Sequence, residues 1–434
     1  MRQILPMGRA TELVLLVALV ATSGACVPSS PRPDWEGIPE PSAWSDYGAI
    51  FESGDVGAWD HYLWGGFASS IVKRGGTYFL YYQGASSYRY AFDETVCGRA
   101  VGVAASSDGV AFEKHDENPI IEWNPTGECE EGAASAGALV DENGEVLILY
   151  GANTARDPMN VHADVRLARS ADGLRFVDEM PVIEYDDAER WGAGDELFAV
   201  AAAYDDEQWR VFYVPNGSPQ RGLLGVAWGR DLADLERSEA VIDPSGEPIR
   251  AWGSASVVRL DDGTDALFVL DNSKDTLNAW SVSPDEPNRA KKLLGSYRID
   301  DVIHAVVHLD REVGTWFMYY HVGDEYRVRL APHGKPDATG PEPPNSIVAE
   351  RRSADSIELT WSPASDPDTG VASYVIYRNG ARVRMESGTS FVDAVYRHGS
   401  HTYEVSGVNF HGVEGERSTA VEVEGAEPAE PGGR

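Results

Sequence analysis

Between residues 35 and 332 the chain alternates short apolar or aromatic runs with polar turns, and no long stretch shows helical periodicity. Runs of about four to eight such residues, bounded by Gly- and Asp-rich turns, are typical of β-strands. The most distinct pair is a small-residue run at 67–73 and an aromatic run at 78–82, joined by an Arg-Gly-Gly turn. Gly-Gly between two β-rich runs indicates a hairpin. The pattern as a whole predicts an all-β domain.

Similar pairs of strands recur along the chain, and a third short β-rich run follows each pair. Five second strands share this position, at residues 78–82, 146–150, 209–213, 266–270 and 316–320. Related turns at 106–109 and 170–173 follow two of the third strands, and their Asp-Gly pairs supply a positive φ. A fourth strand follows in the first three units, within residues 112–122, 176–184 and 235–243. Four strands per unit and five units predict a five-bladed β-propeller.

The two ends of this repeated region are complementary. The fifth unit stops after its third strand at Ala331, where Pro332 and Gly334 begin a linker. Residues 44–52 have the pattern of a fourth strand and lie just before the first unit. We therefore expect the N-terminal strand to complete the last blade and close the ring.

A second domain follows the Pro- and Gly-rich residues 332–344. Its alternating runs have the spacing of a β-sandwich, at residues 357–361, 373–380, 390–393 and 401–408. These runs resemble a fibronectin type III domain over about its whole length, with Trp361 as the core tryptophan and Tyr403 at the tyrosine corner. The resemblance implies an immunoglobulin-like β-sandwich that serves as a spacer or a binding module.

The N-terminus has the pattern of a targeting segment. Arg2 and Arg9 form a basic segment before an apolar run at 13–21 that is too short to span a bilayer as a helix. Ser-Gly-Ala precedes Cys26, which resembles a bacterial lipoprotein signal in which Cys26 becomes lipidated. Cleavage by an ordinary signal peptidase is the alternative. Either way we expect an extracytoplasmic protein, which is secreted or held at a membrane only through Cys26.

The expected boundaries are a lipoprotein-type signal peptide at 1–25, a linker at 26–41, the propeller at 42–332, a linker at 333–344, the fibronectin type III domain at 345–425 and a disordered tail at 426–434. Cys97 and Cys129 both fall within the propeller. An even pair of cysteines in an oxidising compartment favours a disulfide over two free thiols or a metal site.

The formal net charge of −34 narrows the choice of partners. So acidic a surface repels nucleic acid and anionic membranes, and neither is expected as a partner. The acidic residues are scattered along the chain, so most of them are expected on solvated surface. We expect a monomer.

Candidate chemistry comes from the predicted ring. The innermost strand of each blade lines a central channel, so the segments that lead into these strands meet at one mouth. Acidic, aromatic and histidine residues stand there in all five units: Asp60, His61 and Trp64; Glu130 and Glu131; Asp195 and Glu196; Trp252; and Asp300, Asp301 and His304. A solvated loop acid is the alternative for each single carboxylate, but recurrence at equivalent positions favours a site.

Converging carboxylates beside aromatic walls suit glycoside hydrolysis. One carboxylic acid protonates the leaving oxygen, and another acts as base or nucleophile. The aromatic residues that could stack on sugar rings are Trp64, Tyr88, Tyr90 and Trp252, with a buried structural role as the alternative for each. A disulfide between Cys97 and Cys129 would fix Tyr88 and Glu131 around this site.

The strand pattern of residues 44–331 resembles the five-bladed glycoside hydrolases of families 43 and 32. The motifs that carry this resemblance are Trp59-Asp60 before the first blade, Tyr-Phe-Leu-Tyr-Tyr, and Ser-Ser-Asp-Gly-Val-Ala-Phe. The resemblance to family 43 implies that Asp60 is the base, Glu131 the second acidic residue and Glu196 the general acid. Family 43 normally has Asp-Pro at the strand start and Asp rather than Glu in blade two.

Further residues at the same mouth are expected to contact the substrate, namely His61 and Asp195. His304 matches a region of the fifth blade where some relatives hold a calcium or water ligand, and a packed channel histidine is the alternative. We expect no metal and no cofactor, with a structural calcium ion in the channel as the alternative.

The resulting hypothesis is a secreted, lipid-anchored glycoside hydrolase that acts on poly- or oligosaccharides. The alternative is a non-catalytic carbohydrate-binding or scaffold lipoprotein whose propeller acts as a lectin. A glycoside phosphorylase is a third hypothesis, but it needs a phosphate site. Few basic residues lie near the mouth: Arg89, Arg99, Arg156 and Arg250.

Overall fold

The computed structural model describes residues 37–424, apart from short stretches at 64–69, 89–95, 123–131, 158–159, 185–196, 206–207, 216–221, 252–253, 272, 335–336, 354 and 395–398. The described residues form β-strands β1 to β29 and one short 3-10 helix, η1 (Pro41–Ala43). None of the helical structure described is long or apolar enough to cross a membrane. The all-β fold class expected from the sequence is confirmed.

The first two blades form one continuous hydrogen-bonded sheet. Blade one contains β2 (Ser70–Arg74), β3 (Thr77–Tyr88) and β4 (Val96–Ser106), with the short strands β5 (Glu113–Lys114) and β6 (Ile121–Glu122) paired to β4. Blade two contains β7 (Gly132–Val140), β8 (Val146–Asp157), β9 (Asn160–Ser170) and β10 (Val177–Ile183). One parallel bridge, between Arg99 and Gly132, joins the two blades.

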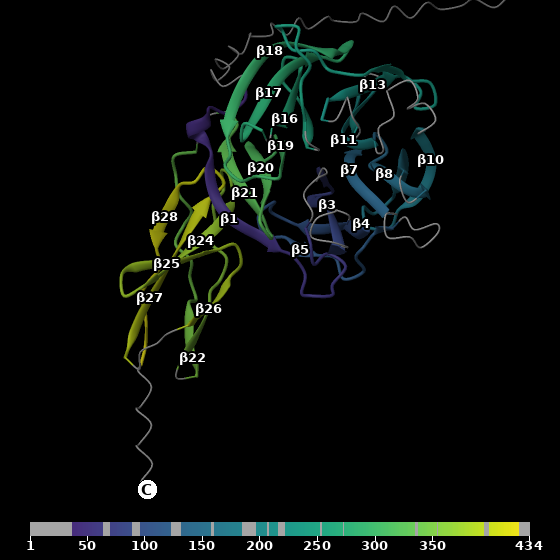
Figure 1. The fold of residues 1–434 in the computed structure, drawn as a ribbon. Helices are drawn as coiled ribbons and strands as arrows, with labels where there is room; N and C mark the ends of the chain where they lie inside the picture. Colours follow the sequence, from purple (N-terminus) through teal and green to yellow (C-terminus); the bar gives the residue numbers. More distant parts are fainter. Residues whose placement is uncertain are drawn as a thin grey trace, which may run out of the picture. The chain divides into compact units, whose positions relative to one another are not determined.

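The next three blades are separate four-stranded antiparallel sheets. Blade three contains β11 (Leu197–Asp205), β12 (Gln208–Pro215), β13 (Gly225–Gly229) and β14 (Glu236–Ser238). Blade four contains β15 (Ala255–Arg259), β16 (Asp265–Asp271), β17 (Thr276–Ser283) and β18 (Glu286–Arg298). Blade five contains β19 (His304–Asp310), β20 (Thr315–Val322), β21 (Glu325–Pro332) and β1 (Ser45–Glu52). The blades follow one another around a common centre (Figure 1).

Closure of the ring by the N-terminal strand is confirmed. Strand β1 pairs antiparallel with β21, from Ser45 opposite Leu330 to Glu52 opposite Glu325. The fifth blade therefore takes its outermost strand from the segment that precedes the first blade. Hydrogen bonds between strands distant in sequence replace a covalent connection at this point.

Apolar clusters fill the gaps between neighbouring blades. One example is the cluster between blades one and two, in which Tyr81 of β3 packs with Ile148 of β8. Equivalent clusters lie between the other neighbours around the ring. Because each blade buries both of its faces, its second strand is almost wholly apolar, as in Leu80–Tyr82 or Ala266–Leu270, and none of these residues is more than 1% exposed.

The Ser-x-Asp-Gly turns connect neighbouring blades. The Tyr81 hydroxyl donates to the Gly173 carbonyl oxygen at 2.9 Å, and the Tyr319 hydroxyl donates to that of Gly109, also at 2.9 Å. Both glycines have positive φ, as the Asp-Gly pattern predicts. A Cβ at Gly109 would lie 2.9 Å from a ring carbon of Phe317, so these turns also need glycine for the close packing of the next blade.

The C-terminal domain is a two-sheet β-sandwich, and this expectation is also confirmed. One sheet contains β22 (Val348–Ser353), β23 (Ser356–Thr360) and β26 (Ser390–Ala394). The other contains β25 (Ala381–Glu386), β24 (Val371–Arg378), β27 (His401–Asn409) and β28 (Glu414–Arg417), with β29 (Val421–Val423) paired to β27. Trp361 packs in its core, and the Tyr403 hydroxyl donates to Asp393 at 2.6 Å.

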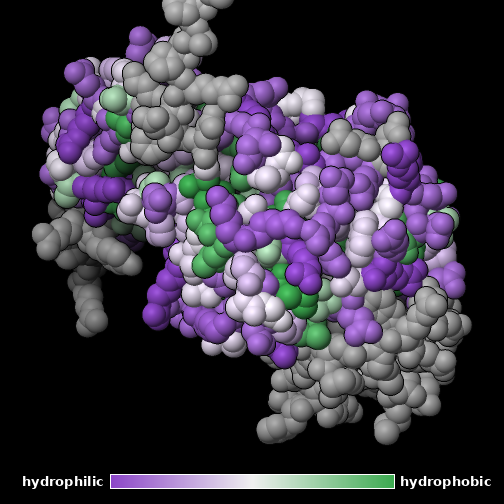
Figure 2. Space-filling model, turned by 90° about the horizontal axis from the view of Figure 1, so that it is seen from above, coloured by the Kyte–Doolittle hydropathy of each residue, from purple (hydrophilic) through white to green (hydrophobic). Residues whose placement is uncertain are grey.

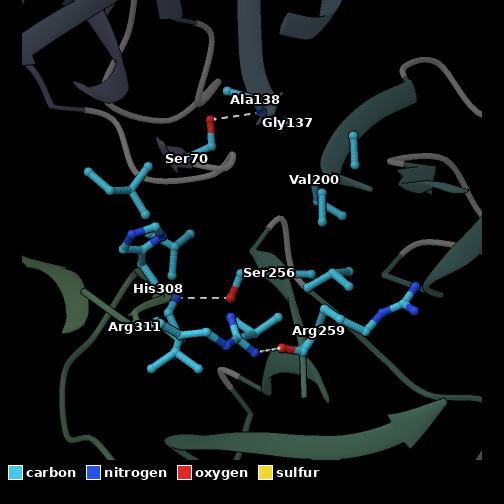
Figure 3. Close-up of a pocket in the computed structure, with 17 residues that line it drawn as sticks. Ser70, Gly137, Ala138, Val200, Ser256, Arg259, His308 and Arg311 are labelled. Carbon is cyan, nitrogen blue, oxygen red and sulfur yellow. Dashed lines mark hydrogen bonds between the residues drawn. The ribbon is translucent and has the colours of Figure 1, made fainter. Parts of the chain in front are cut away.

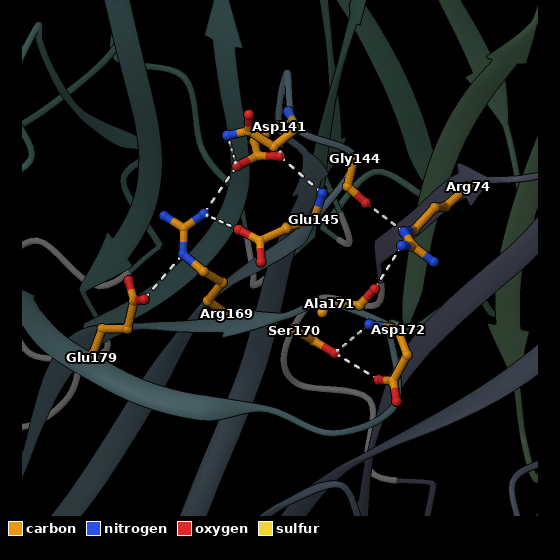
Figure 4. A network of polar contacts seen from close by, with 10 residues as sticks. Arg74, Asp141, Gly144, Glu145, Arg169, Ser170, Ala171, Asp172 and Glu179 are labelled. Atoms are coloured by element: carbon orange, nitrogen blue, oxygen red, sulfur yellow. Dashed lines mark hydrogen bonds and ion pairs between the residues drawn. The ribbon is translucent and has the colours of Figure 1, made fainter.

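The surface seen in Figure 2 is largely hydrophilic, and its hydrophobic residues form only narrow patches. This agrees with a formal net charge of −34. Polar networks also tie blade one to blade two (Figure 4). Arg74 donates to the Gly144 carbonyl oxygen and, at 2.6 Å, to that of Ala171 beside the Ser170–Asp172 turn.

The Asp172 carboxylate offers a test of this turn. It accepts the backbone amides of Leu174 and Arg175, each at 2.8 Å, and these bonds lower its pKa from 3.8 to about 2. Asp172→Ala is expected to lower the free energy of unfolding at pH 7 by about 1 kcal/mol. Since the pKa is lower in the folded state, the stabilisation is complete above about pH 4 and is lost as the pH falls through about 2.

Urea unfolding of wild type and Asp172→Ala at several pH values between 7 and 2 measures this difference. The gap between the two proteins should narrow below about pH 4. Asp285→Ala, in the exposed turn before β18, serves as the control and should leave stability unchanged. A gap that stays constant down to pH 2 would contradict the role of the carboxylate charge.

Candidate functional site

A channel runs through the centre of the ring, and its wall comes from the innermost strand of every blade (Figure 3). It encloses a cavity of about 210 Å³ lined by β2, β7, β11, β15 and β19. Most of the lining side chains are small or aliphatic, for example Ala138, Val200 and Ala255. The predicted convergence of the five innermost strands is therefore present.

Serine side chains connect neighbouring innermost strands across this wall. Ser70 of β2 accepts the Ala138 amide of β7 at 3.0 Å, and Ser256 of β15 accepts the Val307 amide of β19 at 2.9 Å (Figure 3). Ser254 exchanges two hydrogen bonds with the backbone of Ala305, at 2.6 and 3.0 Å. The innermost strands lack a further strand on their channel side, so these hydroxyls satisfy amides that would otherwise have no partner.

The described wall of this cavity contains no carboxylate, and its charged side chains are Arg259 and Arg311. Both arginines are paired with acids outside the cavity. Arg259 donates to Asp265 at 2.7 Å, and Arg311 donates to Asp261 at 3.0 Å. The described wall of this cavity thus supplies no pair of carboxylates for hydrolysis.

A second cavity, of about 470 Å³, shares Ile71, Ala138 and His308 with the first and extends toward the C-terminal ends of the innermost strands. Its wall includes Arg210, which is fully buried. This guanidinium contacts Asp205 at 2.8 Å and Asp265 at 3.0 Å. A buried charge is stable only when paired in this way, so the cluster serves to join blades three and four.

The starts of the innermost strands, where the sequence predicts the site, are only partly described. Glu131 and Glu196 directly precede β7 and β11 in the sequence but lie outside the described residues. The same holds for the other predicted residues Trp64, Glu130, Asp195, Trp252, Cys26 and Cys129. Tyr88 ends β3 and Cys97 lies in β4, and nothing is described of their side chains. The proposed acid, the lipidation site and the disulfide all stay predictions.

Asp60 is described, and its position differs from the free carboxylate expected at the channel mouth. It is 4% exposed and does not line the channel cavity. Its carboxylate pairs with the Lys114 ammonium of β5 at 2.5 Å and accepts the Tyr82 hydroxyl at 3.3 Å. A Cβ at Gly54 or Gly84 would collide with Asp60, so the chain encloses this side chain from two sides.

The physical reason for this position is the packing of the segment between β1 and β2 against blade one. The aromatic ring of Trp59 and the backbone of Asp60 pack over Gly84 and Gly102 of the sheet, which holds Asp60 beside blade one rather than over the channel. In the sequence, the only indication of an ion pair between Lys114 and Asp60 was that Lys114 belongs to the same predicted blade. As base or nucleophile, Asp60 stays a prediction that its ion pair does not favour.

The two predicted histidines also lie in packed surroundings. His61 is half-buried, and its Nδ1 lies 3.1 Å from the Gly54 carbonyl oxygen. His304, the first residue of β19, is 2% exposed and stacks on Tyr326, with the His321 ring centroid 5.4 Å away. Burial, and then the neighbouring His321, holds the pKa of His304 well below 6.5, so this imidazole is neutral at pH 7. Contact of either with substrate stays a prediction.

Within the described ranges there is no group of three or more His, Cys, Asp or Glu side chains able to hold a metal ion. The described carboxylates near the channel form salt bridges with arginines and lysines. Asp310, for example, pairs with Lys73 at 2.6 Å. The structural calcium ion has no identified ligands here and stays a prediction.

Comparison with known proteins gives matches among solved structures alone, because no known family and no curated protein matches the sequence. The chain is similar to RS223-β-xylosidase, with 10% identity and a TM-score of 0.46 over 67% of this chain and 96% of that one. It is similar to a Bombyx mori GH32 β-fructofuranosidase, with 15% identity and a TM-score of 0.43 over 81% and 84% of the two chains.

A third similar structure is an α-L-arabinofuranosidase from Clostridium thermocellum, with 14% identity and a TM-score of 0.38 over 53% of this chain and 74% of that one. At these low values the assignment of the propeller rests on the strand pairing and the channel described above, not on the likenesses.

The Asp60–Lys114 pair can be tested directly. Lys114→Met is expected to lower the free energy of unfolding by about 3 kcal/mol, because it leaves a buried carboxylate without its partner. Asp60→Asn in the same background should recover part of this loss, since the neutral amide no longer needs a cation. Chemical denaturation of the two single variants and the double variant gives the coupling energy.

Lys291→Met is a matched control, because Lys291 pairs with Glu286 on the exposed surface, where an ion pair contributes little to stability. Additive losses in the Asp60 and Lys114 variants would contradict the pairing.

His308 makes stability depend on pH. Its burial in the channel wall lowers its pKa from 6.5 to about 4; the Asp310 carboxylate partly opposes this shift, and Lys73 and Arg311 add to it. The unfolded chain takes up a proton at His308 near pH 6.5 but the folded chain only near pH 4, so stability falls as the pH drops through this interval. His308→Gln should reduce that fall.

Thermal unfolding of wild type and His308→Gln between pH 7 and 4 measures the effect, with His115→Gln as the control. His321, with a pKa also lowered to about 4, remains in the variant and should preserve part of the slope. Identical slopes in wild type and His308→Gln would contradict the assignment.

Proposed function

We propose that this protein is a glycoside hydrolase whose acid and base come from the segments that lead into the innermost strands. One observation carries the proposal. Strands β7 and β11 lie side by side in the channel wall, and their first residues, Gly132 and Leu197, directly follow Glu131 and Glu196 in the sequence. Since consecutive Cα atoms lie about 3.8 Å apart, we propose that both glutamates act at the end of the channel where β7 and β11 begin.

In this proposal Glu196 is the general acid that protonates the leaving oxygen, and Glu131 is the first candidate for the opposing carboxylate. Asp60 ranks behind Glu131, because its ion pair with Lys114 would have to break before it could act on water or on a sugar. Trp64, Tyr88 and Trp252 would supply sugar-stacking surfaces, and His61, Asp195 and His304 further contacts. The substrate is a neutral poly- or oligosaccharide, since the strongly acidic surface disfavours anionic ones.

The proposed location is outside the cytoplasm, with Cys26 as a lipid anchor. It rests on the pattern of basic residues, a short apolar run and small residues before Cys26. The proposed enzyme would then act on glycans that reach the cell surface.

A second candidate function is carbohydrate binding without catalysis. Two observations favour it: Asp60 is held in a buried ion pair, and the described wall of the cavity of about 210 Å³ contains no carboxylate. Asp205 and Asp265, on the wall of the second cavity, are both paired with Arg210. A lectin needs the aromatic and polar groups of the mouth but not a carboxylate pair.

Hydrolysis of a panel of neutral oligosaccharides and aryl glycosides tests the proposal. Glu196→Gln and Glu131→Gln should each lower kcat by about a hundredfold or more, since each removes a proton-transferring group. Glu142→Gln, in the exposed turn between β7 and β8, is the matched control and should leave kcat unchanged.

Calorimetric binding measured on the same panel separates the two functions. Binding without product release by wild type would decide for the lectin. Turnover that survives both glutamate substitutions would overturn the assigned residues.

A further inference from the structure

The hairpin between β27 and β28 of the C-terminal sandwich inserts an aromatic side chain into the propeller core. Phe410, at the tip of this hairpin, is 5% exposed and belongs to the apolar cluster between blades five and one. Its ring lies 6.0 Å from that of Phe317 on β20. Ala372, beside the start of β24, is buried in the same cluster. The core at the closure of the ring thus includes residues of both domains.

The sandwich also contacts the closing strand itself. Tyr47 of β1 packs against Val375 and Val408 of the sandwich. Its hydroxyl donates to the carbonyl oxygen of Asn409 at 3.0 Å. Strand β1 is the outermost strand of blade five and pairs with β21 along one edge. The sandwich therefore covers part of the strand that lacks a further partner in its own sheet.

Polar contacts hold the hairpin tip in place. His411 accepts the Asp337 amide at its Nδ1, 2.7 Å away, so its Nε2 carries the hydrogen that it donates to the Gly314 carbonyl oxygen at 2.9 Å. Gly314 lies in the turn between β19 and β20, and Asp337 lies in the connection between the domains. The Asp337 carboxylate in turn accepts the Asn409 side-chain amide at 3.0 Å. His411 of the sandwich thus contacts both the propeller and the segment that joins the two domains.

We propose that the C-terminal sandwich is a clamp on the ring closure rather than a mobile spacer. The ring is held shut at β1 by strand pairing and side-chain packing, without a covalent bond. Opening at this point would separate β1 from β21 and expose the cluster between blades five and one. The sandwich opposes this by binding β1 through Tyr47 and the cluster through Phe410. This inference does not depend on the proposed hydrolase activity.

Hydrogen–deuterium exchange of the full-length protein tests the clamp. Phe410→Ala, which acts from the sandwich side, should speed amide exchange in β1 and β21 by about tenfold or more. Exchange in β16 and β17 of blade four should stay unchanged. Val392→Ala, on β26 and 59% exposed, is the control within the sandwich and should leave β1 unchanged.

Tyr47→Ala tests the attachment of the sandwich from the propeller side and leaves the core of the sandwich unchanged. It therefore still tests the clamp if Phe410→Ala unfolds the sandwich. It should speed exchange in β27 as well as in β1. The double variant should exchange β1 no faster than the faster single variant, because either change alone releases the sandwich from the ring. Three results would overturn the clamp. The first is unchanged exchange in β1 and β21 when Phe410→Ala leaves the sandwich folded. The others are unchanged exchange in β27 with Tyr47→Ala and fully additive effects in the double variant.

Discussion

Closure of the ring by non-covalent strand pairing is the constraint on which the rest of this molecule depends. Six of the eight residues of β1 have partners on β21, and this pairing closes the five blades into a ring. Only in a closed ring do the five innermost strands line one channel. The aromatic cluster between blades five and one, with Tyr82, Phe317 and Tyr326, packs at this point and continues into the sandwich through Phe410.

The other blade contacts repeat a small set of physical solutions. Apolar second strands fill the gaps between blades, and tyrosine hydroxyls donate to the glycines of Ser-x-Asp-Gly turns on the next blade. Serines on the channel wall take up backbone amides that have no strand neighbour. Together these contacts satisfy polar groups that burial between blades would otherwise leave unpaired, which costs free energy.

The same packing limits where chemistry can occur. The wall of the smaller cavity is made mostly of small and aliphatic side chains, with Arg259, His308 and Arg311 as the exceptions. Charged groups near its far end are neutralised in pairs, as with Arg210 and Asp265. The proposed function therefore assigns the reactive carboxylates to the segments before the innermost strands, which include Glu131 and Glu196. This is why the proposed function concerns that end of the channel.

By itself the sequence determined the fold class, the five repeats, the closing strand and the sandwich, because apolar periodicity and turn residues are local signals that recur in each blade. Trp361 and Tyr403 were placed correctly for the same reason. Tertiary structure alone decided the surroundings of Asp60 and His304. An ion pair with Lys114, 54 residues away, and a stack on Tyr326 depend on distant segments that share no local pattern. The packing of Phe410 into the propeller could not be predicted from the sequence either, since the residues of a hairpin tip do not indicate which surface they will contact.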